Sequence, residues 1–229
     1  MIGNDSDMPK VAIIDYGMGN LFSVKRACEN VGLMPLITSA ANELLSADAA
    51  ILPGVGAFGD AMGYLAERDL VDAIKEFITS GKQFMGVCLG MQLLFSESEE
   101  FGLHRGLGVI QGRVVKFPGN NSSGEKIKVP QVCWNAINRR STAEKDIWMN
   151  SPLVGVRNGD PMYFVHSFYV EPLESDRILS ITDYEGIVYC SSIQQENVFA
   201  CQFHPEKSGL EGIKIYRNWA NKIIEKGAE

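Results

Sequence analysis

The chain has 229 residues, of which 45% are hydrophobic and 21% charged, and its formal net charge is -7. This length allows one domain with a sizeable core, and this composition is typical of an ordinary folded globular protein. An acidic chain without a block of basic residues argues against nucleic acid and anionic membranes as partners. Small molecules or other proteins are the favoured partners.

The apolar runs are short, as in residues 11–14, far below the roughly 18 to 20 residues that span a membrane. Residues 1–9 form a polar leader without the basic start and apolar centre of a signal peptide, so a cytoplasmic location is expected. We expect the rest, residues 10–229, to form a single domain.

The five cysteines and three histidines are dispersed, with no C-x-x-C pair. This pattern fits neither a disulfide framework nor a zinc site, so we expect no metal and no other cofactor. A buried core position is the ordinary role of a cysteine. We expect that role for Cys28, Cys133, Cys190 and Cys201.

The first part of the chain alternates strand-like runs with helical patterns. Strands are predicted over residues 10–15, 35–38, 49–52 and 84–87, and helices over 21–31, over 61–78 and beginning within 91–95. Such alternation implies parallel strands joined by right-handed crossovers. The predicted fold class is therefore α/β, with a mostly parallel central sheet covered by helices on both faces.

After residue 108 the pattern changes to short alternating runs, which predict mostly antiparallel strands added in the C-terminal half. These runs are residues 109–117, 129–137, 162–170, 178–183, 187–193 and 197–203. A last amphipathic helix is expected over about residues 209–226.

The sequence GVCLG at residues 86–90 lies where a buried strand ends and a helix begins. It is the cysteine counterpart of the G-x-S-x-G nucleophile elbow, whose glycines permit a strained turn that exposes the nucleophile. A helix N-terminus favours negative charge and therefore the thiolate form of Cys88. The flanking glycines favour a nucleophile over a buried core cysteine at this position.

A thiolate needs a proton donor for its leaving group, and histidine is the usual donor near neutral pH. His204 and Glu206 stand two positions apart in QFHPE, and such residues project to the same side of an extended segment. This spacing predicts a triad of Cys88, His204 and Glu206. His166 is the rival base, although it has no acidic residue two positions away; its alternative role is a satisfied histidine on a half-buried strand.

The sequence PGVGAFG at residues 53–59 follows a strand and formally contains G-x-G-x-x-G. A dinucleotide site would place this motif at the first strand, with an acidic residue about 20 positions on at the end of the next strand. Here the acidic residues at that distance, within residues 69–76, lie in a predicted helix and not at the end of a strand. The loop does have the backbone freedom to aim N–H groups at a developing oxyanion, with the N–H of Leu89 as a second donor.

These residues resemble class I (triad) glutamine amidotransferases, and among them the glutaminase subunits of imidazole glycerol phosphate synthase. The general resemblance rests on GVCLGMQ at residues 86–92 and HPE at 204–206. The narrower one rests on five further segments in the expected order: DYGMGNL at 15–21, PGVGAFG at 53–59, GLG at 106–108, YFVHS at 163–167 and QFHPEKSG at 202–209.

The resemblance implies a flavodoxin-like fold and a glutaminase half-reaction. Cys88 would attack the carboxamide of L-glutamine, and His204 would protonate the departing ammonia and then activate water to release glutamate. Backbone N–H groups of Val55 and Leu89 would form the oxyanion hole. The residues that would hold the substrate are Gly56, Gln92, Glu100, His166, Ser167 and Phe168.

The resemblance also implies a partner, a (β/α)8-barrel cyclase subunit that forms a heterodimer with the glutaminase. It would use the ammonia to make imidazole glycerol phosphate and an aminoimidazole carboxamide ribotide in histidine biosynthesis. Lys207 matches a family lysine that meets an acidic residue of the barrel, the alternative being a solvated surface lysine. Further interface residues would be Pro130, Trp134 and Tyr163.

One segment departs from the family pattern. Where P-x-M-G-W-N is common, residues 130–135 read PQVCWN, so that Val132 and Cys133 replace methionine and glycine. The segment is expected near the subunit interface and the ammonia exit. The departure therefore concerns docking or gating and leaves the triad unchanged.

Two alternative functions remain. One is the glutaminase subunit of another class I amidotransferase, such as anthranilate, aminodeoxychorismate or pyridoxal phosphate synthase, against which residues 15–21 and 163–167 argue. The other is a non-catalytic paralogue that only binds a partner. Such a paralogue would be expected to lose a member of the triad, whereas all three are present.

Overall fold

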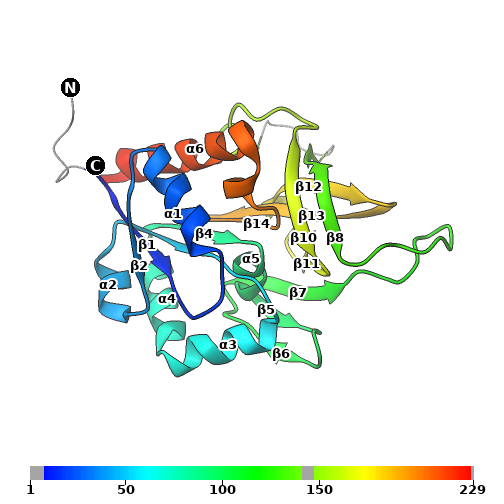
Figure 1. The fold of residues 1–229 in the computed structure, drawn as a ribbon, viewed down its shortest axis with the longest axis horizontal. Coiled ribbons are helices and arrows are strands. Elements are labelled where there is room, and N and C mark those ends of the chain that lie inside the picture. Colours follow the sequence, from blue (N-terminus) through cyan, green and yellow to red (C-terminus); the bar gives the residue numbers. More distant parts are fainter. Residues whose placement is uncertain (1–7, 141–146, 228–229) are drawn as a thin grey trace.

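The computed structural model describes residues 8–140 and 147–227 of the chain (Figure 1). Most of the leader predicted over residues 1–9 thus lies outside the described residues. Pro9 is described, and its carbonyl accepts a hydrogen bond of 2.9 Å from the N–H of Met34. Among the described helices, none is long and apolar enough to cross a membrane.

Five parallel strands form one half of the main sheet, in the order β2-β1-β3-β4-β14. They are β1 (Lys10–Ile14), β2 (Met34–Thr38), β3 (Ala49–Leu52), β4 (Gln83–Val87) and β14 (Val198–Cys201). This is the strand order of flavodoxin-like folds, in which ligands bind beyond the carboxyl ends of the strands. The prediction of a mostly parallel central sheet is confirmed.

Helices cover both faces of this half (Figure 1). Helices α1 (Leu21–Asn30) and α6 (Gly209–Gly227) pack on one face, and α2 (Ala41–Ser46), α3 (Phe58–Glu67) and α4 (Leu70–Thr79) pack on the other. Side chains of β1 alternate between the two faces of the sheet. Val11 and Ile13 pack in the core under α1 and α6, whereas Ala12 and Ile14 pack in the core under α2, α3 and α4. A strand buried on both faces is therefore apolar throughout.

The C-terminal half adds mostly antiparallel strands, as predicted. The sheet continues from β14 through β13 (Ile187–Gln195), β11 (Phe168–Pro172), β7 (Ile110–Lys116), β5 (Phe95–Ser98) and β6 (His104–Arg105). Strand β12 (Ile178–Tyr184) pairs with β13 and with β9 (Asn138–Arg139). A separate antiparallel pair consists of β8 (Gln131–Ala136) and β10 (Pro161–His166).

The single helix predicted over residues 61–78 is wrong, because two helices occupy the segment. Helix α3 ends at Glu67, and Asp69 takes a left-handed conformation with φ of 55° before α4 begins. The spacing of the apolar residues along this segment explains the break. Leu65 and Leu70 are five residues apart, so an unbroken helix of 3.6 residues per turn would turn Leu70 away from the core.

The helix expected to begin within residues 91–95 is also misplaced. Helix α5 (Leu89–Leu93) starts directly after Cys88 and ends early, because Phe95 begins strand β5. The strand expected over residues 162–170 divides at Ser167, where the chain passes from β10 in the small sheet to β11 in the main sheet. This division positions a wall of the site described next.

Candidate active site

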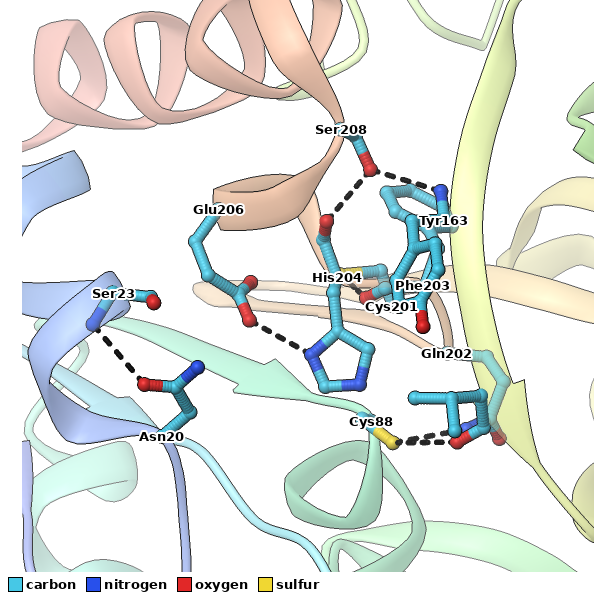
Figure 2. A network of polar contacts seen from close by, with 11 residues as sticks. Asn20, Ser23, Cys88, Tyr163, Cys201, Gln202, Phe203, His204, Glu206 and Ser208 are labelled. Carbon is cyan, nitrogen blue, oxygen red and sulfur yellow. Dashed lines mark hydrogen bonds and ion pairs between the residues drawn. The ribbon is translucent and has the colours of Figure 1, made fainter. Parts of the chain in front are cut away.

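The candidate site lies beyond the carboxyl ends of three neighbouring parallel strands. Residues 53–57 follow β3, Cys88 follows β4, and His204 comes soon after β14. Figure 2 shows the His204 ring between Glu206 and Cys88. The α/β sheet thus brings the three residues of the predicted triad together at the edge where such folds bind ligands.

Cys88 occupies a strained turn, with φ of 56° and ψ of -112°. Non-glycine residues rarely adopt positive φ, and such strain concentrates at functional sites. A Cβ atom at Gly90 would overlap the carbonyl oxygen of Leu52, and one at Gly86 would lie 2.9 Å from Cδ1 of Leu94. The two glycines of GVCLG are therefore required by close packing around the nucleophile elbow.

The Cys88 side chain is 6% exposed and has polar neighbours. Its Sγ lies 3.9 Å from the carbonyl oxygen of Val165, and Nε2 of Gln202 donates to it over 3.7 Å. The backbone N–H of Cys88 donates to the carbonyl of Cys201 over 2.8 Å, which ties the elbow to β14. The sulfur thus lies at a fixed point between β4, β10 and β14.

His204 and Glu206 form a buried pair. Nδ1 of His204 lies 2.8 Å from Oε1 of Glu206, and the two side chains are 3% and 1% exposed. The predicted pairing is present, but the extended geometry inferred for it is wrong, because Glu206 lies in the 3-10 helix η3 (Pro205–Lys207). Hydrogen bonds from the N–H of His204 to the Tyr163 carbonyl (2.9 Å) and from Ser208 Oγ to the His204 carbonyl (2.6 Å) hold this turn.

The electrostatics of the pair favour a protonated imidazole. Burial lowers the pKa of His204, but the charge of Cys88 and then the hydrogen bond and charge of Glu206 outweigh it and raise the pKa to about 10. The second ring nitrogen, Nε2, is buried, has no conventional hydrogen-bond partner among the described residues, and faces Cys88 (Figure 2). The ring can therefore exchange a proton with whatever is bound at the sulfur.

The remaining cysteines differ from Cys88. Burial raises the pKa of Cys28 to about 12 and raises those of Cys190 and Cys201, so these are unreactive core thiols as expected. Cys133 was expected in the core too, but it is only partly buried. It lies on β8, whose small sheet also leaves Val132 and Trp134 more than half exposed.

A pocket of about 260 Å³ lies beside Cys88. This volume is below the roughly 300–1,000 Å³ of drug-sized sites and suits a small metabolite. All the predicted oxyanion and substrate residues line it, together with Pro130, which was expected at the partner interface, and Val165, which was not predicted. The full lining is Val55, Gly56, Cys88, Leu89, Gln92, Glu100, Pro130, Val165, His166, Ser167 and Phe168.

Two polar side chains of the pocket are held by the backbone. Nε2 of Gln92 donates to the carbonyl of Phe168 and to Oε1 of Gln202, each over 2.9 Å. Oε2 of Glu100 accepts from the N–H of Phe58 over 2.7 Å, at the start of α3, and burial raises the pKa of Glu100. Both groups are fixed in position before any ligand binds.

His166 lines the pocket but is poorly placed as a rival base. Burial lowers its pKa to about 4. Its Nδ1 lies 2.8 Å from the Phe168 carbonyl and its Nε2 lies 3.2 Å from the Tyr189 hydroxyl. Both nitrogens are already engaged, which favours the alternative role of a satisfied histidine.

The glycine loop at residues 53–59 packs against residues 15–21. The Tyr16 hydroxyl donates to the Pro53 carbonyl over 3.0 Å, and a Cβ atom at Gly56 would overlap the Met18 side chain. Gly56 has φ of 97°, which favours glycine, and the neighbouring Val55 is 43% exposed. Since the loop follows β3 and not β1, its position also disfavours the dinucleotide interpretation.

An aromatic cluster reaches from His204 to the surface. The Tyr163 ring lies 6.4 Å from the His204 ring and 6.1 Å from the Trp134 ring, centroid to centroid, and Nζ of Lys207 lies 5.9 Å from the Tyr163 centroid. Trp134 is 54% exposed. Three of the four predicted interface residues thus form one patch next to the triad.

Comparison with known proteins shows the family to which the chain belongs. Residues 12–223 match the family model "Glutamine amidotransferase class-I". The protein named imidazole glycerol phosphate synthase subunit HisH from Syntrophotalea carbinolica is 45% identical over 213 residues, which are 92% of this chain and 99% of the relative. The chain belongs to the HisH family of class I glutamine amidotransferases.

Other relatives agree with this assignment. The amidotransferase is 47% identical over 213 residues to the subunit of the same name from Caldanaerobacter subterraneus subsp. tengcongensis, across 93% of this chain and 98% of that one. Among solved structures, PurLQS from Thermotoga maritima superposes with a TM-score of 0.70 at 21% identity, covering 94% of this chain and 99% of the other. The second comparison concerns the fold alone.

The described part of the amidotransferase contains no group of three or more histidine, cysteine, aspartate or glutamate side chains arranged to hold a metal ion. Val165 and Gln202 are the functional-site neighbours that sequence reasoning did not single out. The signal that points to them is their place in the chain, since Val165 directly precedes His166 and Gln202 stands two positions before His204.

Proposed function

We propose that this chain is the glutaminase subunit of an imidazole glycerol phosphate synthase. Residues 10–229 would act as one cytoplasmic amidotransferase domain that hydrolyses L-glutamine to glutamate and ammonia. A (β/α)8-barrel cyclase subunit would receive the ammonia and form imidazole glycerol phosphate and an aminoimidazole carboxamide ribotide in histidine biosynthesis. The observation that carries the proposal is the buried Cys88–His204–Glu206 arrangement beside a small pocket, and the names of the relatives support it.

The first half of the reaction is acylation. The Cys88 thiolate attacks the carboxamide carbon of glutamine, and the carbonyl oxygen becomes an oxyanion near the backbone N–H groups of Val55 and Leu89, which line the pocket. Each such donor typically contributes about 3 kcal/mol to transition-state stabilisation. His204 gives its Nε2 proton to the departing nitrogen, so ammonia leaves and a thioester remains.

The second half is hydrolysis, for which His204 must become a base. The Cys88 charge is the largest influence that raises the pKa of His204. Formation of the thioester removes that charge, so the pKa of His204 falls. The neutral ring then accepts a proton from water, which attacks the thioester and releases glutamate and the thiolate. One buried pair thus serves both half-reactions.

Glutamine would be held by the groups that surround the pocket. The Glu100 carboxylate is suited to the α-ammonium group, and the Gln92 amide and backbone of residues 166–168 are suited to the remaining polar atoms. Gly56 gives the oxyanion loop its positive φ and its close approach to Met18. Prior fixing of these groups reduces the entropic cost of binding.

The cyclase would dock on the patch of Trp134, Tyr163 and Lys207. Tyr163 lies next to His204, so ammonia produced at the triad emerges beside this surface. We infer that the loop at residues 53–57 changes between an idle and a competent state when the partner binds its nucleotide. Such a shift requires different affinities for the two states, and a glutaminase rate that is the same with and without nucleotide would contradict it.

The experiment is to measure glutamate release by this chain alone, with the cyclase subunit, and with the cyclase subunit plus its ribonucleotide. We expect a large rise in the complete mixture, its loss in Cys88→Ala, and its retention in Cys28→Ala, a matched cysteine variant in the core. Turnover that is independent of the partner would instead favour a free-standing glutaminase. No turnover in any mixture would favour a non-catalytic binding subunit.

A further inference from the structure

A chain of buried polar groups runs behind the wall of the glutamine pocket. The Tyr189 hydroxyl on β13 lies 2.9 Å from the side-chain amide of Gln131 on β8 and 3.2 Å from Nε2 of His166 on β10. Nδ1 of His166 in turn lies 2.8 Å from the Phe168 carbonyl. Gln131 and Tyr189 are 0% and 3% exposed, so the chain lies in the protein interior.

The same series of hydrogen-bonded polar groups continues to the nucleophile, Cys88. The Phe168 carbonyl also accepts from Nε2 of Gln92, and that nitrogen contacts Oε1 of Gln202, each over 2.9 Å. Nε2 of Gln202 donates to Sγ of Cys88 over 3.7 Å. Both His166 and Gln92 thus bond to the Phe168 carbonyl, which fixes the pocket wall at residues 166–168.

The donors and acceptors determine where the protons lie. A backbone carbonyl only accepts, so Nδ1 of His166 must carry the ring proton toward Phe168. Burial keeps the ring neutral by lowering its pKa to about 4, which leaves Nε2 as an acceptor. The Tyr189 hydroxyl is placed to donate to it, since burial raises the pKa of Tyr189 and keeps its proton on. Because the hydroxyl has a single proton, its donation to His166 requires the Gln131 amide to present its NH2 group to the hydroxyl oxygen.

We propose that Tyr189 is a positioning residue for the glutamine pocket: its hydroxyl holds His166, which together with Gln92 holds the Phe168 carbonyl and the pocket wall at residues 166–168. This inference rests on the proposed glutaminase function. A phenylalanine at position 189 would keep the ring contacts with Phe117 and Phe164, whose centroids lie 5.4 and 6.2 Å away. It would leave the buried Nε2 of His166 without that donor.

Loss of the hydroxyl should weaken glutamine binding equally in the ground state and the transition state. In the complex with the cyclase and its nucleotide, we expect Tyr189→Phe to raise the KM for glutamine about five-fold, the effect of about one hydrogen bond, and to leave kcat within about two-fold. Tyr184→Phe is the matched control, because Tyr184 also packs on Phe117 but donates to the Lys128 carbonyl away from the pocket. Its KM should equal that of the wild type.

A double-variant cycle tests whether Tyr189 acts through the shared carbonyl. In a Gln92→Met background the Phe168 carbonyl has already lost one of its two hydrogen bonds. Tyr189→Phe should therefore raise the KM for glutamine by less than it does in the wild type. Equal effects in both backgrounds would overturn the proposed route. An unchanged KM in Tyr189→Phe, or a fall in kcat alone, would overturn the positioning role. Normal turnover by the wild type would still support the glutaminase function.

A measurement without catalysis complements the kinetics. In protein labelled with ¹⁵N-histidine, we expect nuclear magnetic resonance to show a neutral His166 with the proton on Nδ1 near pH 7. A ring protonated mainly on Nε2 would overturn the inference even if no variant could be assayed. Absence of wild-type glutaminase activity would count against the proposed function instead. The tautomer of His166 would still test whether the Tyr189 hydroxyl donates to Nε2.

Discussion

Nδ1 of His204 lies 2.8 Å from Oε1 of Glu206, although a turn of 3-10 helix rather than an extended strand carries the carboxylate. The turn is held by Ser208, whose hydroxyl donates to the His204 carbonyl and accepts from the N–H of Tyr163. Orientation of the imidazole therefore depends on contacts with β10 as well as on Glu206. The carboxylate fixes the ring with Nε2 toward Cys88 (Figure 2).

Glu206→Gln should lower kcat for glutamine hydrolysis by at least about 100-fold with little change in KM. The amide keeps the size of the side chain but no longer stabilises the imidazolium, and general acid–base catalysis contributes about 10² to 10⁴. Steady-state kinetics of the complex with the cyclase measure this. The control is Glu211→Gln, which removes an acidic group paired with Lys214 on α6. A Glu206→Gln enzyme within ten-fold of the wild type would contradict the assigned role.

The pH dependence of His204 follows from its neighbours. Its pKa of about 10 is above the ordinary value of 6.5, so the ring of the free enzyme should stay protonated at pH 7 and lose its proton as the pH rises toward 10. Removal of the largest raising influence by Cys88→Ala should lower this pKa more than Glu206→Gln does. A nuclear magnetic resonance titration with Cys28→Ala as control checks the order, and an equal pKa in Cys88→Ala and wild type would refute it.

Packing around the elbow gives a stability prediction. Gly90→Ala would press a methyl group into the Leu52 carbonyl, and overpacking of this kind costs about 1–3 kcal/mol or more. Gly63→Ala is the matched control, since the added Cβ meets nothing within 4 Å and alanine favours the helix by about 0.5–1 kcal/mol. Denaturant unfolding should show opposite signs for the two variants. A neutral Gly90→Ala would mean that the glycine is not needed for close packing.

Local sequence patterns predicted much of the fold and the site. Apolar strands and flanking glycines placed β4, the elbow and the parallel half of the sheet. They missed the break at Asp69, because a single phase shift between Leu65 and Leu70 is a weak signal inside a long apolar stripe. The pairing of His204 with Glu206 was predicted from an extended geometry that the chain does not have.

Features that depend on tertiary contacts were beyond local patterns. The run at residues 162–170 reads as one strand, yet Ser167 divides it because its two halves pair with different strands, β8 and β7. Tyr189 and Gln131 are far apart in the chain, and neither has a sequence signature for positioning His166. The partial exposure of Cys133 likewise depends on how the small sheet is covered.

Covalent labelling tests the central assignment of Cys88 most directly. In the complex with the cyclase and its nucleotide, a glutamine analogue with an electrophilic ketone at the position of the carboxamide should modify one residue per amidotransferase chain. Peptide mass spectrometry should locate the label on Cys88, and glutaminase activity should fall in proportion to labelling, with excess L-glutamine giving protection. Labelling of another residue, or glutamate release that survives complete modification of Cys88, would contradict the account.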